Sequence, residues 1–434
     1  MTILESREHT INREEQVKMA TEQNTPVINF WDPLFYEDCD EAMRWLLEKA
    51  PVYRCAPPDY PGEPFWVLSK WTDIRAAGSD WKTFSSAAGV HLGENVYSAA
   101  DSEKKIEKKT EVPDDPRFAV AMKPSAYYDP PQHTRLRGLV RAVFHPKRIR
   151  SFEEATVKIV DSVLDGLPVG EPVDVAEALS WIPCKVVCEV LGVGESRSDD
   201  FMTWTKAIFS SYEPDTPPDY GKISEMFDYL DEELEARRQS PREDALTDFV
   251  TAEYEGSGLT NDECLMWSWM LLAGGQDTTT DLIVTGLRAL LEHPQEWQRL
   301  VANPDLARNA VEELLRWVVP DRNMGRTAAC DTEIRGVKIS KGDFVLFNYV
   351  AANRDPDTYD NPDAFDIGRE FLNDHLAFGF GPHYCAGQLL ARMEGRVFLE
   401  RMIARFPNTK ISGPVQSFPS IRLAKTRHLT VTLG

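Results

Sequence analysis

The sequence predicts a mainly α-helical protein with small β-sheets, and three observations support this prediction. First, a helical pattern of about 33 residues extends over 260–293, long enough at about 1.5 Å per residue to cross a whole domain. Second, apolar residues recur at helical spacing in shorter stretches, at 152–167, 173–191, 199–212 and 304–319. Third, the β signals are brief, at 65–68, 334–339 and 344–347, with a C-terminal alternation of Ile421, Leu423, Leu429 and Val431.

The chain has 434 residues, and neither a Gly/Ser-rich linker nor a repeat period divides it. We therefore expect one domain over 25–434, preceded by a flexible polar N-terminus over 1–24. No run approaches the roughly 20 apolar residues of a membrane span, and the polar start of the chain lacks the apolar core of a signal peptide. These features predict a soluble cytoplasmic protein.

The composition argues against several partners. A net charge of −22 disfavours binding to nucleic acid or to anionic membranes. The chain is 42% hydrophobic, which is enough for a core that also buries a large cofactor. The seven cysteines show no metal-site spacing, and Cys184 and Cys188 lie one helical turn apart, which suits packing better than a disulfide.

The N-terminal third is predicted to contain a helix, a strand and a surface loop. The stretch 26–53 has a helical pattern that Asp32 or Asp38 could cap. Weak periodicity over 85–128, including the charge run 103–109, predicts a solvated loop. Further along the chain, a proline-rich break at 213–220 separates two helices.

One cysteine stands in an unusual setting. A glycine-rich loop within 375–396 presents Cys385 just before a helical pattern begins. The helix dipole and the N–H groups of Ala386, Gly387 and Gln388 would favour its thiolate form, which can ligate a metal or attack an electrophile. The alternative for a single cysteine is a small buried apolar residue. The other six cysteines are expected to be inert; they are Cys39, Cys55, Cys184, Cys188, Cys264 and Cys330.

The residues around this cysteine form a specific motif. Phe378-Gly379-x-Gly381-x-His383-x-Cys385-x-Gly387 resembles the haem-thiolate loop of the cytochrome P450 family, FGxGxHxCxG. The resemblance implies that Cys385 is the axial ligand to the iron of haem b and that Phe378 covers its sulfur. Gly379, Gly387 and His383 belong to the same loop, and the glycines let it lie close under the porphyrin. The implied fold is that of the family, with the haem between the central long helix and the cysteine loop.

Two further segments resemble the family's haem-binding residues. The segment 129–137, Asp-Pro-Pro-Gln-His-Thr-Arg-Leu-Arg, implies that His133 and Arg137 bond one haem propionate. These two residues are spaced i, i+4, so both can reach one carboxylate. Arg326 aligns with the arginine that takes the other propionate. The alternative for the first segment is a basic surface helix.

The central helical pattern contains residues that its helical propensity does not explain. It opens with a capping box, Thr260-x-x-Glu263, and 273–281 then reads Ala-Gly-Gly-Gln-Asp-Thr-Thr-Thr-Asp. We expect a local opening of the hydrogen-bond ladder there, filled by a hydroxyl group or water. The segment is similar to the family's (Ala/Gly)-Gly-x-(Asp/Glu)-Thr motif, which implies that Gly274 leaves room for dioxygen and that Asp277 and Thr278 deliver protons. A plain helix–helix contact is the alternative.

A supporting cluster is also implied. Glu313 and Arg316 share a helical face, and the family couples such a Glu-x-x-Arg pair to an arginine in the segment before the cysteine loop, here Arg369. A buried Glu–Arg–Arg cluster adds little stability but fixes geometry. Its role would therefore be structural.

The resemblance extends from about residue 25 to the end and implies a monooxygenase that inserts one oxygen atom from O2 into a small, lipophilic organic substrate. Because no flavin- or nicotinamide-binding domain is attached, electrons would come from a separate ferredoxin and its NAD(P)H reductase. Oxidative coupling or ring formation, peroxide-driven oxygenation and a non-enzymatic haem sensor are the alternatives. The acid–alcohol pair Asp277 and Thr278 argues against the peroxide-driven reaction.

The sequence leaves two alternatives open for each residue that could face the substrate. Asp321 and Arg322 align with a segment that faces the substrate, where they could anchor a polar group or lie at the surface. The candidates for apolar walls are Trp267, Met270, Phe209 and Phe418, each of which could equally be core.

A basic run lies between His133 and Arg150 in an otherwise acidic chain. In the family this region borders the surface beneath the cysteine, so it is expected to attract an acidic ferredoxin. The run contains no Asp or Glu, and Arg392 could join it; its members are Arg135, Arg137, Arg141, Lys147, Arg148 and Arg150.

Overall fold

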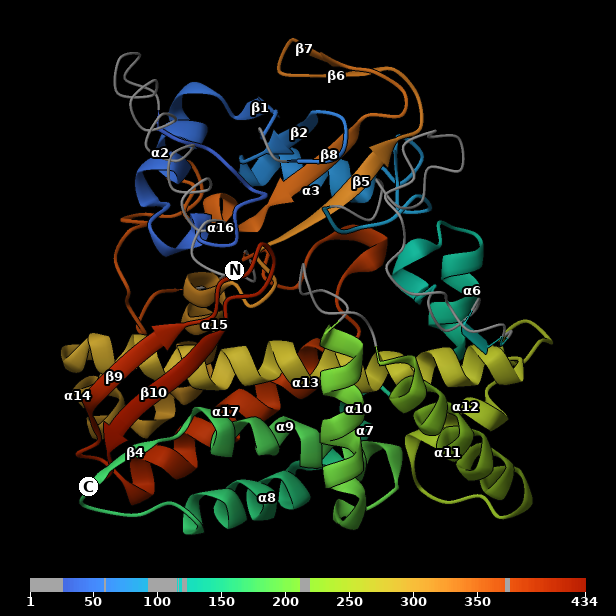
Figure 1. The fold of residues 1–434 in the computed structure, drawn as a ribbon, viewed down its shortest axis with the longest axis vertical. Coiled ribbons are helices and arrows are strands. Elements are labelled where there is room, and N and C mark those ends of the chain that lie inside the picture. The colour runs from blue at the N-terminus through green and yellow to red at the C-terminus, as the bar shows by residue number, and fades with distance from the viewer. Residues whose placement is uncertain are drawn as a thin grey trace, which may run out of the picture.

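Helix α13 (Asn261–Glu292) crosses the computed structural model from one side to the other (Figure 1). The structure describes residues 26–57, 60–92, 115, 117–118, 123–210, 219–370 and 375–434, with backbone only at 209 and 210. The predicted flexible N-terminus, the charge run 103–109 and most of the break 213–220 lie outside the described residues.

The start of α13 confirms the predicted capping box. The Thr260 hydroxyl accepts a hydrogen bond from the Glu263 N–H at 3.2 Å, and the Glu263 carboxylate accepts one from the Thr260 N–H at 2.9 Å. These two bonds satisfy donors that a helix start otherwise leaves free. The helix then continues for 32 residues without a break.

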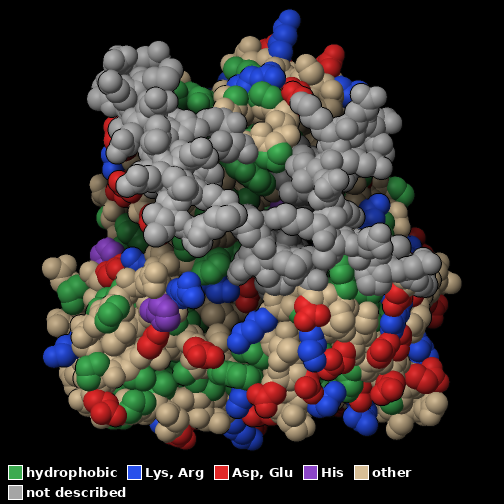
Figure 2. Space-filling model, in the orientation of Figure 1, with side chains coloured by type: hydrophobic (Ala, Val, Ile, Leu, Met, Phe, Trp, Pro, Cys, Tyr) green, Lys and Arg blue, Asp and Glu red, His purple; other side chains and the backbone are tan. Residues whose placement is uncertain are grey.

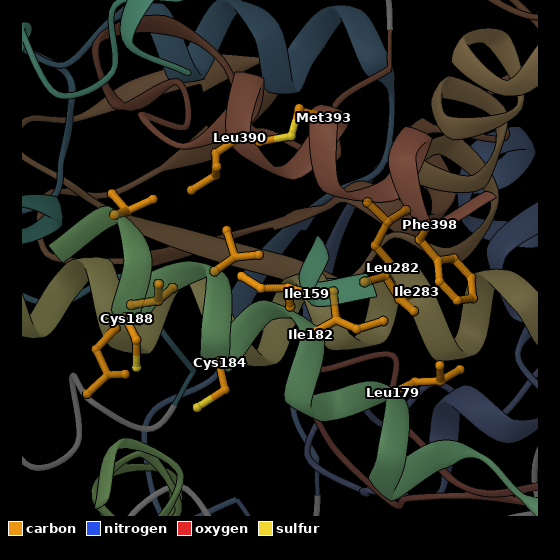
Figure 3. Close-up of a cluster of buried hydrophobic side chains, with 14 of the residues drawn as sticks. Ile159, Leu179, Ile182, Cys184, Cys188, Leu282, Ile283, Leu390, Met393 and Phe398 are labelled. Atoms are coloured by element: carbon orange, nitrogen blue, oxygen red, sulfur yellow. The ribbon is translucent and has the colours of Figure 1, made fainter. Parts of the chain in front are cut away.

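The helices α9 (Ala176–Leu191) and α17 (Gln388–Arg405) pack directly against α13, and α8 (Glu153–Asp165) packs on both of them to complete the main core. Figure 3 shows apolar side chains of all four helices meeting in one cluster, among them Ile159, Ile182, Leu282, Ile283 and Phe398. Cys184 and Cys188 are fully buried free thiols within this cluster, which confirms packing over a disulfide.

The larger sheet lies on the other side of α13 from α8 and α9 (Figure 1). Its strand order is β1-β2-β8-β5-β3, and only the pair β2 and β8 is parallel among the described strands. The strands are β1 (Val52–Cys55), β2 (Phe65–Leu68), β3 (Phe84–Ser85), β5 (Asn323–Ala328) and β8 (Phe344–Asn348). The strands predicted at 65–68 and 344–347 are confirmed.

Two smaller sheets complete the β structure. One has the order β4-β10-β9, and the other is the hairpin β6-β7. Their strands are β4 (Pro172–Asp174), β6 (Thr332–Ile334), β7 (Val337–Ile339), β9 (Lys410–Ser417) and β10 (Thr426–Thr432). The single strand predicted over 334–339 is wrong, because Arg335 and Gly336 have positive φ angles and form a turn. Of the predicted C-terminal alternation, Leu429 and Val431 lie in β10, and Leu423, before the predicted break, forms an isolated β-bridge with Asp321.

The helix predicted over 26–53 is much shorter. The helix α2 spans Asp40–Lys49, preceded by the 3-10 turn η1 (Phe35–Glu37). The Asp32 carboxylate accepts a hydrogen bond from the Leu34 N–H at 2.9 Å and so caps a turn rather than the helix. Neither Asp32 nor Asp38 caps α2, whose N-cap is Cys39.

The remaining elements cover this framework. The helices are α3 (Trp71–Ser79), α6 (Gln132–Leu139), α7 (Pro146–Ser151), α10 (Ser198–Ser210), α11 (Tyr220–Gln239), α12 (Ala245–Thr251), α14 (Pro294–Ala302), α15 (Ala307–Val318) and α16 (Tyr349–Ala352). The 3-10 turns are η2 (Ser125–Tyr127), η3 (Glu195–Arg197), η4 (Pro304–Leu306) and η5 (Gly381–His383). Acidic side chains gather at the lower right of Figure 2, over α11 and α12. None of the described helices has the length and hydropathy needed to cross a membrane.

Candidate active site

A cavity of about 310 Å³ lies between α13 and the loop that carries Cys385. It brings together residues that the sequence predicts as cofactor-binding or catalytic, although they are far apart along the chain. Those that line it are His133, Arg137, Gly274, Thr278, Arg326, Phe378, Gly379, His383, Cys385 and Gly387. Asp277 does not line the cavity and lies next to Thr278 on α13.

The cysteine loop depends on its glycines. Gly379 and Gly381 have φ angles of 67° and 77°, which L side chains rarely adopt. A Cβ atom on Gly381 would lie 2.1 Å from the carbonyl oxygen of Gly78, so the loop could not pack against α3 with any other residue. The Cys385 N–H donates to the Phe378 carbonyl at 3.0 Å, which closes the loop over the cavity.

Burial dominates the electrostatics of Cys385. It raises the pKa of the thiol, while the Gly387 N–H and the guanidinium groups of Arg137 and Arg392 lower it by a smaller amount. The Gly387 N–H therefore favours the thiolate in the expected direction, but burial outweighs its effect. A metal ion deprotonates a coordinating thiol outright, so a thiolate at this position fits a metal-bound state.

Two arginines, Arg326 buried and Arg137 half-buried, border the same cavity without an acidic partner among the described residues. Arg137 donates to the Tyr384 carbonyl at 2.8 Å and Arg326 to the Gly325 carbonyl at 2.6 Å, and among the described residues neither forms an ion pair. Burial lowers the pKa of both guanidinium groups. Because buried charges are normally paired, this arrangement suits an anionic ligand such as the propionates of haem.

Two histidines lie beside these arginines. The rings of His133 and His383 are tilted by 48° to each other with their centroids 4.2 Å apart, and His383 Nε2 lies 3.1 Å from the Ser86 hydroxyl. Burial, together with Arg137 and Arg326, lowers the pKa of His133 to about 4. Both rings can therefore donate or accept hydrogen bonds in their neutral form at pH 7.

The opposite wall of the cavity is α13. The Thr278 hydroxyl donates to the Gly274 carbonyl at 2.8 Å within an uninterrupted α-helix, so the expected opening of the ladder does not occur. A Cβ atom added to Gly274 or to Gly387 would meet no atom within 4 Å among the described residues. The two facing walls are thus bare where a flat cofactor would lie.

Asp277 forms an ion pair that the sequence did not predict. Its carboxylate lies 3.5 Å from the ammonium group of Lys425, which precedes β10. Burial raises the pKa of Asp277, and Lys425 and Arg422 partly offset this effect. Lys425 belongs to no motif, so nothing in the sequence could have associated it with α13.

The burial of two further carboxyl groups was not predicted from the sequence. Asp281 and Glu394 are each 1% exposed, and burial raises the pKa of both far above the usual range. Among the described residues, one carboxyl oxygen of each has no hydrogen-bond partner. A single acidic residue in a helical pattern predicts a solvated face, so sequence offered no signal for either.

The predicted Glu–Arg–Arg cluster is confirmed in its geometry. Glu313 and Arg316 are fully buried and bond through two contacts of 2.7 and 2.8 Å, and Arg369 lies 3.3 Å from the same carboxylate. A neighbouring cluster was missed, in which Glu312 bonds Arg392 at 2.6 Å and His375 at 2.9 Å. Both clusters tie α15 to the segment around the cysteine loop.

Only some of the residues that the sequence suggests for the substrate site line the cavity. Trp267, Met270 and Asp321 line the cavity, whereas Arg322 does not. The Arg322 guanidinium stacks on the Tyr36 ring at 4.6 Å and donates to a backbone carbonyl. Phe418 is not among the lining residues either, and the side chain of Phe209 lies outside the described residues.

Only some cations of the basic run are exposed where a partner protein could contact them. Arg135, Arg148 and Arg392 form ion pairs with Glu263, Asp248 and Glu312, respectively, so their charges are locally balanced. The run members Arg141, Lys147 and Arg150 are exposed. The predicted patch is therefore smaller than the sequence indicated.

A partly buried cysteine that faces a bare stretch of helix, with arginines that lack acidic partners at the edge, is the arrangement of a haem-thiolate protein. The family model described as Cytochrome P450 matches residues 118–420 of this chain, which therefore belongs to the cytochrome P450 family. It is a P450 monooxygenase whose cofactor is haem b.

Named relatives support this assignment. The chain is 33% identical over 393 residues to the vitamin D(3) 25-hydroxylase of Pseudonocardia autotrophica, covering 87% of this chain and 89% of that protein. It is 32% identical over 378 residues to the 6-deoxyerythronolide B hydroxylase of Saccharopolyspora erythraea, covering 86% and 90%. The solved structure of the bacillaene synthase cytochrome P450 PksS of Bacillus subtilis matches with a TM-score of 0.83 at 27% identity, covering 94% of this chain and 100% of that chain.

Proposed function

We propose that this P450 hydroxylates a lipophilic, natural-product-like or xenobiotic-like molecule, with Cys385 as the iron ligand and with Asp277 and Thr278 as the proton donors. The observation that carries this proposal is the cavity itself, because it joins Cys385 to Gly274 and Thr278 across open space. Bound haem b supplies the iron chemistry that activates O2. The protein has to hold the cofactor, exclude water and deliver protons.

Four side chains and one N–H group would hold the cofactor. Cys385 would ligate the iron, and the Gly387 N–H would stabilise its sulfur. Arg326 would neutralise one propionate, and His133 with Arg137 the other. The propionates would thus provide the acidic partners that both arginines lack among the described residues. Phe378 would shield the sulfur from solvent.

Proton supply would come from α13. In the structure the Thr278 hydroxyl donates to Gly274, and rotation about its side-chain torsion would aim it into the cavity. Asp277 would pass protons to it, and burial raises the pKa of this carboxyl group, which favours the protonated form that can donate a proton. Lys425 would keep Asp277 oriented.

The lining supports a lipophilic substrate. Beyond the predicted haem position the cavity wall is largely apolar, with Val90, Trp267, Trp269, Met270, Met324 and Leu423 among its members. Two relatives are named for vitamin D(3) and 6-deoxyerythronolide B. We extend that class of substrate, lipophilic natural-product-like molecules, to this chain.

Electron supply is the remaining part of the proposal. We assign it to a small acidic ferredoxin and an NAD(P)H reductase in the cytoplasm, with residues 25–434 acting as one domain. The exposed cations Arg141, Lys147 and Arg150, on and beside α7, would steer the ferredoxin. Peroxide-driven and coupling reactions use the same cofactor but would differ in their products and oxidants.

Labelled oxygen provides the test. Purified holoenzyme with a surrogate ferredoxin and reductase should consume NAD(P)H in the presence of a lipophilic substrate and place one atom of ¹⁸O2 in the product. Incorporation of oxygen only from added peroxide would indicate a peroxygenase. Dimeric or cyclised products without labelled oxygen would indicate a coupling enzyme.

A further inference from the structure

One ion pair lies in the wall of the apolar cavity. Asp321, just before β5, and Arg422, just before β10, both line the cavity and are joined by contacts of 3.0, 3.2 and 3.3 Å. Their side chains are 16% and 20% exposed. An ion pair is an unexpected component of a wall that otherwise consists mainly of apolar side chains, so its purpose requires an explanation.

The backbone holds this pair rigidly. The two segments form an isolated bridge between Asp321 and Leu423, and the Arg322 N–H donates to the Arg422 carbonyl at 2.8 Å. The Ala424 N–H donates to the Pro320 carbonyl at 3.1 Å. Because these bonds fix both segments, the carboxylate and the guanidinium group are preorganised toward the cavity.

The neighbours of the pair leave its charge balanced. Met324 and Leu423 lie close to the pair along the chain and also line the cavity, and His91 is another titratable lining residue, on which Arg422 acts. Burial and the adjacent Arg422 and Arg326 hold the pKa of His91 well below its usual value, so this ring is neutral. The pair therefore presents one acceptor and one donor with no net charge.

We propose that the Asp321–Arg422 pair anchors a neutral hydroxyl or carbonyl group of the substrate and so selects lipophilic alcohols and ketones over carboxylic acids. This inference rests on the proposed monooxygenase function and names the substrate class of the same site. A hydroxyl group can donate to Asp321 or accept from Arg422, and a carbonyl group can accept from Arg422.

The selection follows from the charges that the pair already contains. A substrate carboxylate placed against Arg422 would also approach Asp321, and two carboxylates in a poorly solvated wall repel each other. A cationic group would meet the same difficulty at Arg422. A neutral group disturbs neither charge, and a hydrogen bond to a charged partner is worth about 10- to 100-fold in affinity.

Matched pairs of ligands test the proposal. Equilibrium dialysis of the holoenzyme near pH 7 would compare decanol with decanoate, perillyl alcohol with perillate, and a cholanol with its cholanoate. In the wild type, at least one alcohol should bind about tenfold or more tightly than its carboxylate. Asp321→Asn leaves the Arg422 charge unopposed, so the preference should reverse in favour of the carboxylate.

A gain of carboxylate binding cannot result from unfolding, which makes the reversal decisive. Asp161→Asn is the matched control, because Asp161 pairs with Arg401 and Arg405 away from the cavity lining, and it should behave as the wild type. An unchanged preference in Asp321→Asn, equal binding in the wild type, or no alcohol bound would each overturn the anchor. Econazole binding to the iron reports the haem site independently, so its loss would instead indicate failure of the proposed function.

Discussion

The helices on the two sides of the cavity differ in how well their buried carboxyl groups are paired. On the cysteine side, α15 carries Glu312 and Glu313, and each carboxylate contacts two side chains. Glu313 contacts Arg316 and Arg369, and Glu312 contacts Arg392 and His375. On the α13 side, Asp277 has one contact of 3.5 Å, and one oxygen of Asp281 has no partner among the described residues. The satisfied side is built as a fixed support, and the unsatisfied side retains groups that can exchange protons.

The pKa values follow the same division. Burial opposes ionisation of Glu312, but the hydrogen bonds from His375 and Arg392 hold its pKa at about 2. For Asp281 burial prevails over the nearby Lys425, and the pKa is raised well above the usual value. Glu394 is the exception on the cysteine side, since it lies on α17 and is also buried with a raised pKa. The comparison indicates that the close cationic or hydrogen-bonding partners of a carboxyl group, rather than its depth of burial, determine whether it stays ionised.

The largest effect is expected where the support is broken. Glu313→Gln should lower the free energy of unfolding by about 3–5 kcal/mol, because it leaves Arg316 buried without a counter-charge. Urea unfolding and haem content measure the effect. The control Glu400→Gln removes an exposed partner of Arg396 and should cost no more than about 1 kcal/mol. Equal stability of both variants would contradict the support role.

A pH series sharpens the contrast. The pKa of Glu312 in the folded protein is about 2, below its usual value, so the ionised group stabilises the fold above about pH 4.5 and this contribution is lost between about pH 4.5 and 2. Glu312→Gln should therefore destabilise the protein by about 3 kcal/mol at pH 7, and by progressively less below pH 4.5. Urea unfolding of both proteins across this range measures the difference. A difference that does not change with pH would show that the loss is one of packing alone.

On the α13 side, function should change while the fold is retained. Thr278→Ala should keep haem loading and substrate binding while NAD(P)H consumption yields mostly peroxide instead of product, because the proton-donating hydroxyl is lost. Asp277→Asn should mainly slow turnover, by roughly 10²-fold, because it removes the relay. Product and peroxide yields per NAD(P)H measure both effects. Thr285→Ala is the control, since its hydroxyl bonds the Ala424 carbonyl and lies outside the cavity lining.

If both active-site variants stay fully coupled at the normal rate, the assignment of the proton donors is wrong. If either variant lost folded protein, the α13 side would also support the fold. The contrast between a supporting cysteine side and a proton-exchanging α13 side would then not hold.

The smallest effect concerns the surface. Arg141→Glu should slow reduction by ferredoxin several-fold at low salt, and less at high salt, where charges are screened over about 8 Å. Dithionite reduction should not change. Lys338→Glu makes the same charge change on the β6-β7 hairpin, far from α6 and α7 (Figure 1), and should leave ferredoxin reduction unaffected. Equal kinetics in all three proteins would remove the patch from the proposal.

Sequence motifs predicted the cysteine side better than the α13 side. The loop around Cys385 and the cluster of Glu313, Arg316 and Arg369 could be found because each depends on fixed local spacings. The α13 residues Gly274 and Thr278 were found for the same reason. The partners Lys425 for Asp277 and Arg422 for Asp321 were missed, because these pairs join segments about 100 or more residues apart and no pattern marks their members.

The secondary-structure elements were also predicted with unequal success. The long central helix and its capping box were predicted well, since a sustained period of 3.6 residues is a strong signal. The N-terminal helix was predicted too long because the turn chemistry of Asp32 and Pro33 was not recognised. Strands β1, β4 and β9 were missed, because strands this short or this exposed depend on their neighbours for stability.

The most direct test of the central claim is the absorption spectrum of the reduced protein with carbon monoxide. The account predicts a red-shifted Soret band in the wild type, because thiolate ligation by Cys385 donates electron density to the iron. The band should disappear in Cys385→Ser and persist in Cys330→Ser, which changes an exposed cysteine. A Cys385→Ser protein that binds haem and keeps the red-shifted band would contradict the account.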